Sequence, residues 1–148
     1  MRNCQRGFSL LETLVVASIA GTLAAVTIPN LSGAVNAHRL QGGLRTTVGA
    51  IRVARSAAIS RNIQGRVTVS DDGKTLTVEV NRPGTGWTTI GTARALDGGV
   101  SVSSVSPANG LLFNSQGTVT NAVTVTLQNA RGDTRQIAVS LLGGVEVS

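Results

Sequence analysis

A single carboxylate, Glu12, interrupts an otherwise apolar stretch near the start of the chain. The stretch GFSLLETLVVASIAGTLAAVTIPNL covers residues 7–31 and contains no basic side chain. A charged side chain at the centre of a bilayer costs about 2.5–3.5 kcal/mol, so an acid in such a run requires compensation. Because neither a second acid nor a histidine accompanies Glu12, the pattern supports no hydrolytic mechanism and indicates a structural charge.

Other residues that could do chemistry are sparse. Cys4 is the only cysteine and His38 the only histidine, so the chain offers neither an internal disulfide nor the ligand set of a zinc site. Asp71 and Asp72 adjoin a glycine and are interpreted as turn acids, since a calcium site requires about 6–8 oxygen ligands. The sequence therefore predicts a protein that is not an enzyme and that binds neither a metal nor another cofactor.

Length and composition limit the kind of domain that can hold these residues. The 148 residues are enough for one domain, and the net charge of +6 is dispersed along the chain. Phe8, Trp87 and Phe113 are the only aromatic residues. The core of such a domain must therefore be built from aliphatic side chains.

The apolar segment from residue 8 to 31 is long enough to cross a membrane as a helix. At about 1.5 Å per residue it would extend about 36 Å, against a hydrocarbon core of about 30 Å. Arg2 and Arg6 precede it, which predicts a cytoplasmic N-terminus and an extracytoplasmic remainder. A cleaved secretory signal peptide and a plain signal anchor are alternatives, although the run is long for the former and lacks a good cleavage site.

The stretch GFSLLETLVV resembles the processing site of type IV pilins and type II secretion pseudopilins. The resemblance implies that residues 1–7 are a leader, which a prepilin peptidase removes by cutting between Gly7 and Phe8. Phe8 would then be methylated on its new amino group, and Glu12 would be the fifth residue of the mature chain. Gly21 and Pro29 match positions at which many type IV pilins carry helix-weakening residues.

This resemblance gives Glu12 a partner. The amino group released at Phe8 has an unperturbed pKa of about 7.7–8.0 and stays cationic after methylation. In a filament, Glu12 of one subunit can pair with the Phe8 ammonium of its neighbour, and each charge offsets the desolvation of the other. Such a pair also fixes the axial register, because a slipped alignment leaves the carboxylate unpaired. Glu12 is therefore interpreted as a filament-assembly residue.

Residues 32–63 predict an amphipathic continuation of the N-terminal helix. Apolar side chains recur on one side of it and should pack on a sheet, while Gly42 and Gly43 could interrupt it and Asn62 is a plausible end. Arg45 and Arg52 are expected to flank the apolar stripe as solvated or covering side chains, with nucleic-acid contact as the minor alternative. The apolar stripe consists of Leu40, Leu44, Ile51 and Ala58.

Residues 64–148 predict a β-rich globular head. Apolar and polar residues alternate on either side of DDG, which indicates a hairpin over residues 66–80, and NARGD at 129–133 indicates a second hairpin turn. We assign no cell-adhesion function to the Arg-Gly-Asp triplet in that turn. The chain is thus predicted to be α+β, with one long helix followed by six to eight antiparallel strands.

This plan resembles the GspH/FimT group of pseudopilins and minor pilins. Three segments carry the resemblance: ARSAAISRN leading into GRVTV, LLFNSQGTVT, and RQIAVSLLGGVEV. It implies a minor subunit of a type II secretion pseudopilus or of a type IV pilus. The subunit would be held in the cytoplasmic membrane before it enters the filament, and its partners would be other pilin-like subunits and the prepilin peptidase.

DNA binding is the serious alternative, because some minor pilins of this group bind DNA through a Gly-Arg-x-Arg motif near the C-terminus. The matching place here, residues 143–146, reads GGVE and lacks both arginines. A membrane-anchored β domain that never assembles is a further alternative. A phosphate-contacting patch would have to use scattered arginines of the head, namely Arg66, Arg82, Arg94, Arg131 and Arg135.

Overall fold

The computed structural model describes residues 9–96, 98–108 and 110–148, and for residues 26–32 it describes the backbone alone. The leader of residues 1–7, with Gly7, and the expected mature terminus Phe8 lie outside the described residues. The chain divides into two compact units, residues 1–35 and residues 36–148. Among the described residues, no helix combines the length and the apolarity needed to cross a membrane.

Helix α1 spans Leu10–Arg61 and contributes to both units. The backbone is helical through Gly21, Pro29 and the Gly42–Gly43 pair. The interruption that the two glycines could have caused is therefore not found, and the helix continues past Pro29. Gly43 faces the core, where an added Cβ would lie 2.8 Å from Cγ1 of Val100, so packing against the sheet explains this glycine.

The end of α1 confirms the predicted stop at Asn62. This residue adopts a left-handed conformation with a φ of 52°. Its backbone N–H donates to the carbonyl of Ile59 at 3.2 Å, and the N–H of Ile63 donates to the carbonyl of Ala58 at 3.1 Å. These are the hydrogen bonds of a Schellman motif, in which asparagine is the usual substitute for glycine. The motif turns the chain directly into the first strand.

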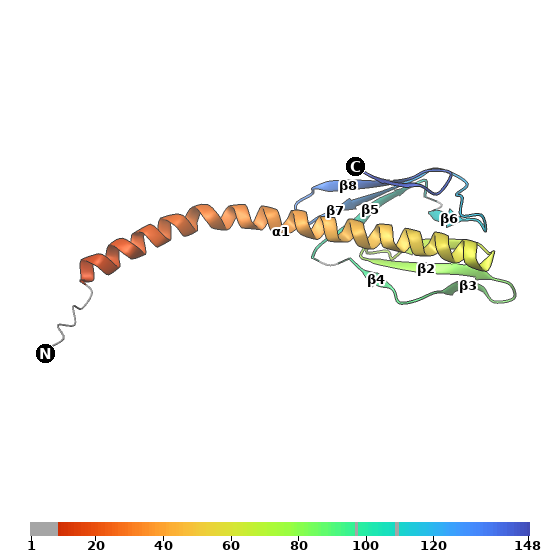
Figure 1. Cartoon of the computed structure of the whole chain (residues 1–148), viewed down its shortest axis with the longest axis horizontal. Helices are drawn as coiled ribbons and strands as arrows, with labels where there is room; N and C mark the ends of the chain where they lie inside the picture. Colours follow the sequence, from red (N-terminus) through yellow and green to blue (C-terminus); the bar gives the residue numbers. More distant parts are fainter. Residues whose placement is uncertain (1–8, 97, 109) are drawn as a thin grey trace, which may run out of the picture. The chain divides into compact units, whose positions relative to one another are not determined.

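The head packs two antiparallel sheets against the second part of α1 (Figure 1). The strands are β1 (Gly65–Val69), β2 (Thr75–Arg82), β3 (Gly86–Thr89), β4 (Arg94–Ala95), β5 (Ser101–Ser106), β6 (Leu111–Phe113), β7 (Val123–Gln128), β8 (Thr134–Val139) and β9 (Val145–Val147). One sheet has the order β3-β2-β1-β6, with β4 also pairing with β2, and the other has the order β5-β7-β8-β9.

One aliphatic cluster joins the three layers of the head. The apolar stripe predicted on α1 is buried, with exposed fractions of 5% for Leu40 and 1% for Ile51. It packs with residues from both sheets, among them Leu76 of β2 and Leu127 of β7, around the fully buried Phe113. The core is thus aliphatic with a single aromatic side chain from β6, as the composition predicts.

The strand pattern agrees with the predicted hairpins but not with the predicted strand count. β1 and β2 pair with Val67 opposite Val78, and β7 and β8 pair across the Asn129–Asp133 turn. The described residues contain nine strands, whereas six to eight were expected. The excess comes from short elements such as β4. This strand has two residues, forms by pairing with β2 and is too short to show an alternation of apolar and polar residues.

Candidate functional site

The start of α1 carries a helix cap that explains where the helix begins. The hydroxyl of Ser9 accepts a hydrogen bond from the N–H of Leu11 at 3.2 Å, and the Ser9 carbonyl accepts one from the N–H of Glu12 at 3.0 Å. Glu12 lies in the first turn, where a negative charge interacts favourably with the helix dipole. The sequence SLLE is the signal of a capping box, which the sequence analysis missed.

The polar side chains that follow Glu12 are satisfied inside the helix. The hydroxyl of Thr13 donates to the carbonyl of Leu10 at 2.9 Å, and that of Ser18 donates to the carbonyl of Val15 at 2.8 Å. The hydroxyl of Thr22 donates to the carbonyl of Ser18 at 2.6 Å. Hydroxyls bonded in this way need no partner outside the helix, which suits a surface that meets lipid or other apolar helices.

The same segment presents a continuous apolar surface. Large apolar side chains between residues 10 and 23 have exposed fractions from 49% to 80%. A soluble monomer rarely exposes so many of them together, so the surface marks an interaction with another apolar body. These side chains are Leu10, Leu11, Leu14, Val15, Val16, Ile19 and Leu23.

Glu12 is therefore the exception on this surface. Its carboxylate is exposed and forms no ion pair with any residue that the structure describes. The hydroxyls of residues 10–25 are bonded to the backbone, but the carboxylate has two oxygens that accept hydrogen bonds and a charge that can be neutralised only from outside the helix. This arrangement can bind a cation presented by another chain.

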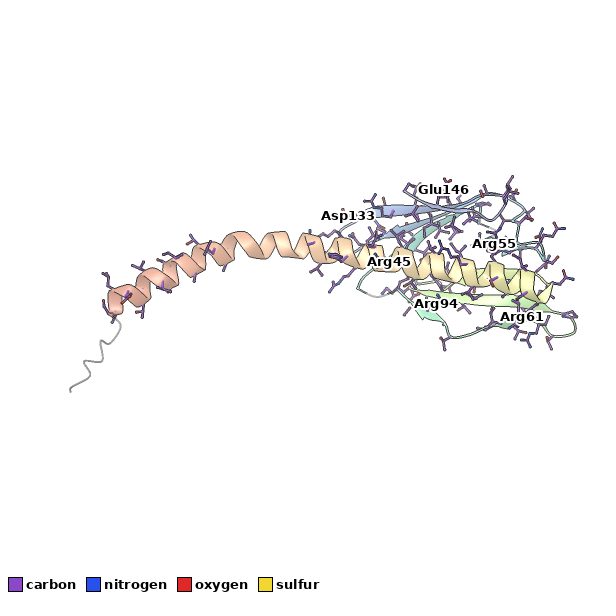
Figure 2. All side chains as sticks on the ribbon, in the orientation of Figure 1. Arg45, Arg55, Arg61, Arg94, Asp133 and Glu146 are labelled. Atoms are coloured by element: carbon purple, nitrogen blue, oxygen red, sulfur yellow. The ribbon has the colours of Figure 1, made fainter. Side chains whose placement is uncertain are left out.

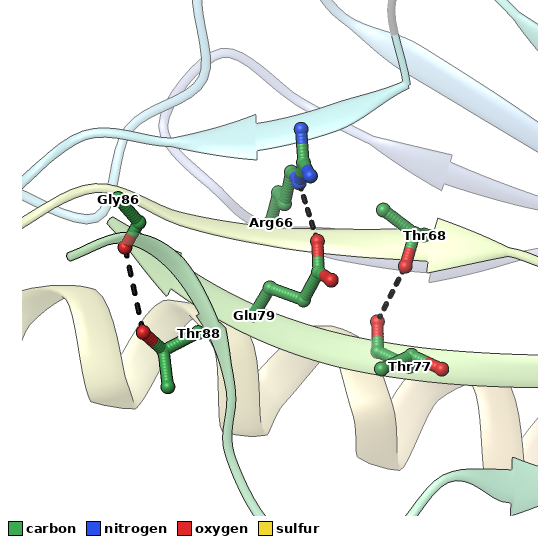
Figure 3. A network of polar contacts seen from close by, with 6 residues as sticks. All are labelled: Arg66, Thr68, Thr77, Glu79, Gly86 and Thr88. Atoms are coloured by element: carbon green, nitrogen blue, oxygen red, sulfur yellow. Dashed lines mark hydrogen bonds and ion pairs between the residues drawn. The ribbon is translucent and has the colours of Figure 1, made fainter. Parts of the chain in front are cut away.

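In the head, Arg66 is already engaged by its neighbours (Figure 3). Its Nε donates to Oε2 of Glu79, directly across from it on β2, at 2.7 Å. Its guanidinium carbon lies 4.1 Å from the centre of the Trp87 ring, a cation–π contact. The indole is thereby covered on one face by an arginine. Arg66 and Trp87 therefore already contact each other, and Arg66 also pairs with Glu79.

The remaining arginines of the suggested phosphate patch are divided between the two sheets. Arg82 and Arg94 belong to the first sheet, whereas Arg135 is on β8 of the second sheet and Arg131 precedes it in the turn. The suggested patch is thus divided between the two sheets, and no observation among the described residues of the head favours DNA binding.

The acidic turn residues have a local structural role. Asp72 accepts hydrogen bonds from the hydroxyl of Ser70 and, at 2.9 Å, from the N–H of Lys74. The Ser70 hydrogen bond, followed by that of Lys74, lowers the pKa of the Asp72 carboxyl. Within the described residues no cluster of acids, cysteines or histidines could hold a metal ion.

Arg55 is a residue whose role the sequence analysis did not identify. It lies on α1, and its guanidinium donates to the carbonyls of Leu142 and Gly143, both at 2.9 Å. Figure 2 shows the side chain on the side of α1 that faces the second sheet. Arg45 and Arg52 are exposed, in agreement with the solvated side chains that were expected beside the apolar stripe. Arg55, by contrast, is partly buried, because its guanidinium reaches across to the turn between β8 and β9.

A helix with an exposed apolar first part, followed by a head in which two antiparallel sheets pack on the same helix, defines a pilin-like protein. The family model of the type II transport protein GspH matches residues 44–143. The chain belongs to this family, whose members are structural pilin and pseudopilin subunits. The model of the prokaryotic N-terminal methylation motif matches residues 2–28.

Solved structures show the same fold. The minor pseudopilin EpsH from the type 2 secretion system of Vibrio cholerae is 14% identical, and the alignment covers 77% of this chain and 97% of that one with a TM-score of 0.62. The type IV minor pilin FimU of Pseudomonas aeruginosa is 19% identical, with 75% and 89% covered and a TM-score of 0.63. No curated protein sequence is similar enough to match the chain. The predicted α+β class and the predicted GspH/FimT-like group are confirmed.

Proposed function

We propose that this chain is a minor subunit of a type II secretion pseudopilus or a type IV pilus, and that Glu12 holds it in the filament. A prepilin peptidase cuts between Gly7 and Phe8 and methylates the amino group of Phe8. The Glu12 carboxylate of one subunit then pairs with the Phe8 ammonium of the next. The observation that carries the proposal is the exposed carboxylate of Glu12, which pairs with no described residue and stands on an apolar helix whose hydroxyls at residues 13, 18 and 22 are bonded internally.

The energetics favour pairing over solvation of the carboxylate. The apolar side chains around Glu12 would be buried when subunits assemble, which contributes about 1.5–3 kcal/mol for each side chain that becomes fully buried. The same burial desolvates the carboxylate, and leaving a buried charge without its partner costs about 3–5 kcal/mol. The terminal ammonium of a neighbouring subunit removes that cost, so the pair selects one alignment of the two helices.

Before assembly the chain would be held in the cytoplasmic membrane by residues 8–31. Arg2 and Arg6 would keep the leader in the cytoplasm, where the peptidase acts. The head of residues 64–148 would lie outside the membrane, with residues 32–63 as its helical stem. Gly21 and Pro29 would allow the helix to lose regularity between them when the subunit leaves the membrane for the filament.

Mass spectrometry of the mature full-length chain tests the processing step. The proposal predicts an N-terminus that begins at Phe8 with one added methyl group, and it predicts that Gly7→Val blocks both changes. A chain recovered from assembled filaments with its leader still attached would contradict the proposal.

Variants of Glu12 test the assembly step. We expect both Glu12→Ala and Glu12→Gln to lower incorporation into sheared filaments at least about tenfold, because an unpaired ammonium is left buried. Glu146→Gln removes an exposed acid of β9 and should leave incorporation unchanged. Normal incorporation of both Glu12 variants would refute the pairing.

A further inference from the structure

The outward face of α1 in the head carries arginines that pair with no described residue. Arg45 and Arg52 are exposed and lie seven residues apart, which places them two turns apart on the same side of the helix. Neither side chain makes a hydrogen bond or an ion pair with any described residue, and the ion pair found in the head is that of Arg66 and Glu79. The two charges therefore contribute nothing visible to the fold of the single chain.

A third arginine reaches the same face from the sheet. Gly49 lies between Arg45 and Arg52 on the helix, and a Cβ added there would be 2.9 Å from Nη1 of Arg94. The missing side chain at residue 49 thus gives the Arg94 guanidinium room beside the helix, where Figure 2 labels it below Arg45. We name the surface formed by Arg45, Gly49, Arg52 and Arg94 the arginine face.

The stem helix of a second copy of this chain carries no acid that could pair with the arginine face. Between Thr13 and Ser70 the sequence contains no aspartate or glutamate. A stem-to-stem contact between two copies would therefore place the arginines against a helix that carries further arginines and no carboxylate. The guanidinium group matches a carboxylate with two parallel hydrogen bonds, and like charges brought together oppose association.

Gly42 indicates that the occupant of this face is a helix. It shares the outward side of α1 with the exposed Ser56, fourteen residues further along. A Cβ added at Gly42 would meet nothing within 4 Å, so the fold of the single chain does not require glycine there. Glycine inside a helix lowers its stability, whereas a small residue on the helix surface allows another helix backbone to approach closely.

We propose that the arginine face is the docking surface for the stem helix of a second, different pilin-like subunit that carries aspartate or glutamate. This inference rests on the proposed function, since it concerns the neighbour of this chain in the filament. It assigns separate tasks to the two parts of α1. Glu12 sets the axial register with a terminal ammonium, and the arginine face selects which subunit stands beside the stem.

The test uses the full-length chain and a full-length partner from the same host. The partner is the pilin-like subunit with the most acidic residues in the part of its N-terminal helix that follows the apolar segment. The two are co-produced, and co-purification from detergent-solubilised membranes is measured with a tag on either chain. A differently tagged second copy of this chain, vesicles of anionic lipid and double-stranded DNA are measured in parallel.

The double variant Arg45→Glu/Arg52→Glu should lower co-purification at least about tenfold. Exchanging the acids of the partner for arginine should restore it. Gly42→Ala should weaken co-purification although it makes the isolated chain more stable. Arg82→Glu is the matched control, because it reverses an exposed arginine at the end of β2 away from the helix, and it should change nothing.

Three results would overturn the inference. The first is unchanged co-purification of the double variant with the acidic partner. The second is self-association of the wild-type chain that exceeds its binding to that partner. The third is loss of binding to vesicles or DNA in the double variant while partner binding is retained. Failure of the proposed function is recognised separately, by incorporation that does not depend on Glu12 and by a chain that keeps its leader.

Discussion

Replacing Arg55 by Ala should destabilise the head by disconnecting α1 from the turn between β8 and β9. The Arg55 guanidinium donates to the carbonyls of Leu142 and Gly143, which lie 87 and 88 residues further along the chain. These bonds join the helix to the turn that returns the chain to the edge strand β9. Without them, β9 is held by its pairing with β8 and by the partly buried Val145.

The size of the effect follows from two opposing contributions. A hydrogen bond to a charged group contributes about 1.5–3 kcal/mol, and Arg55 makes two of them. Against this, its Nε is buried without a partner among the described residues, which costs about 1–3 kcal/mol. The side chain is half-buried, and water can replace part of the contact with the exposed Leu142. We therefore expect Arg55→Ala to lower the free energy of unfolding by about 2 kcal/mol.

Urea denaturation of the full-length chain in detergent measures this change, with the fluorescence of Trp87 reporting the unfolding of the head. Hydrogen exchange should also show faster exchange of the β9 amides, since the loss is local to this edge. Arg52→Ala removes an exposed arginine of the same helix and should change the stability by less than about 0.5 kcal/mol. An Arg55→Ala chain as stable as the Arg52→Ala chain would refute the reasoning.

Three further predictions follow from the head. Phe113→Ala empties the centre of the core and should cost about 3–5 kcal/mol in a denaturant titration, whereas Leu142→Ala, at 75% exposure, should cost under about 0.5 kcal/mol. Gly43→Ala should destabilise the chain by about 1–2 kcal/mol because the Cβ meets a buried valine, and Gly42→Ala, with open space around it, should raise the melting temperature. The carboxyl of Asp72 should titrate below the usual Asp pKa of about 3.9 in an NMR titration. Because its pKa is lower in the folded chain than in the unfolded chain, its contribution to stability is present above the unfolded-state pKa. That contribution is lost as the pH falls through the folded-state pKa. A midpoint at or above the usual value would contradict the hydrogen bonds of the turn.

Local signals in the sequence predicted much of the fold. The stripe that includes Leu40 and Ile51 recurs at helical spacing, and both residues are buried because that spacing holds up to the end of the helix. The two hairpins follow from alternation on either side of turn residues, which is also a local pattern. Asn62 ends the helix because asparagine tolerates the left-handed conformation that the last turn requires.

The features that the sequence did not predict depend on contacts between distant segments. Gly43 was interpreted as a weak point of the helix, but it is the place where the helix approaches Val100. The role of Arg55 depends on carbonyls near the other end of the chain, which no periodicity reveals. β4 is a strand because β2 extends beside it. Sequence patterns therefore predict whether a segment is a helix or a strand and where it ends. Contacts between distant segments determine the roles of residues such as Gly43 and Arg55.

The first turn of α1 shows how one carboxylate can serve the single chain and the filament at the same time. Glu12 stands three residues after the capping Ser9, where an acid or its amide stabilises the start of a helix. Capping alone would explain its presence and would accept glutamine at the loss of only the helix-dipole contribution, about 0.3–1 kcal/mol, since both side chains can accept a hydrogen bond. Pairing with an ammonium requires the charge. Glu12→Gln therefore separates the two roles: it keeps the cap but removes the charge, so a loss of incorporation larger than the helix dipole accounts for measures the filament role.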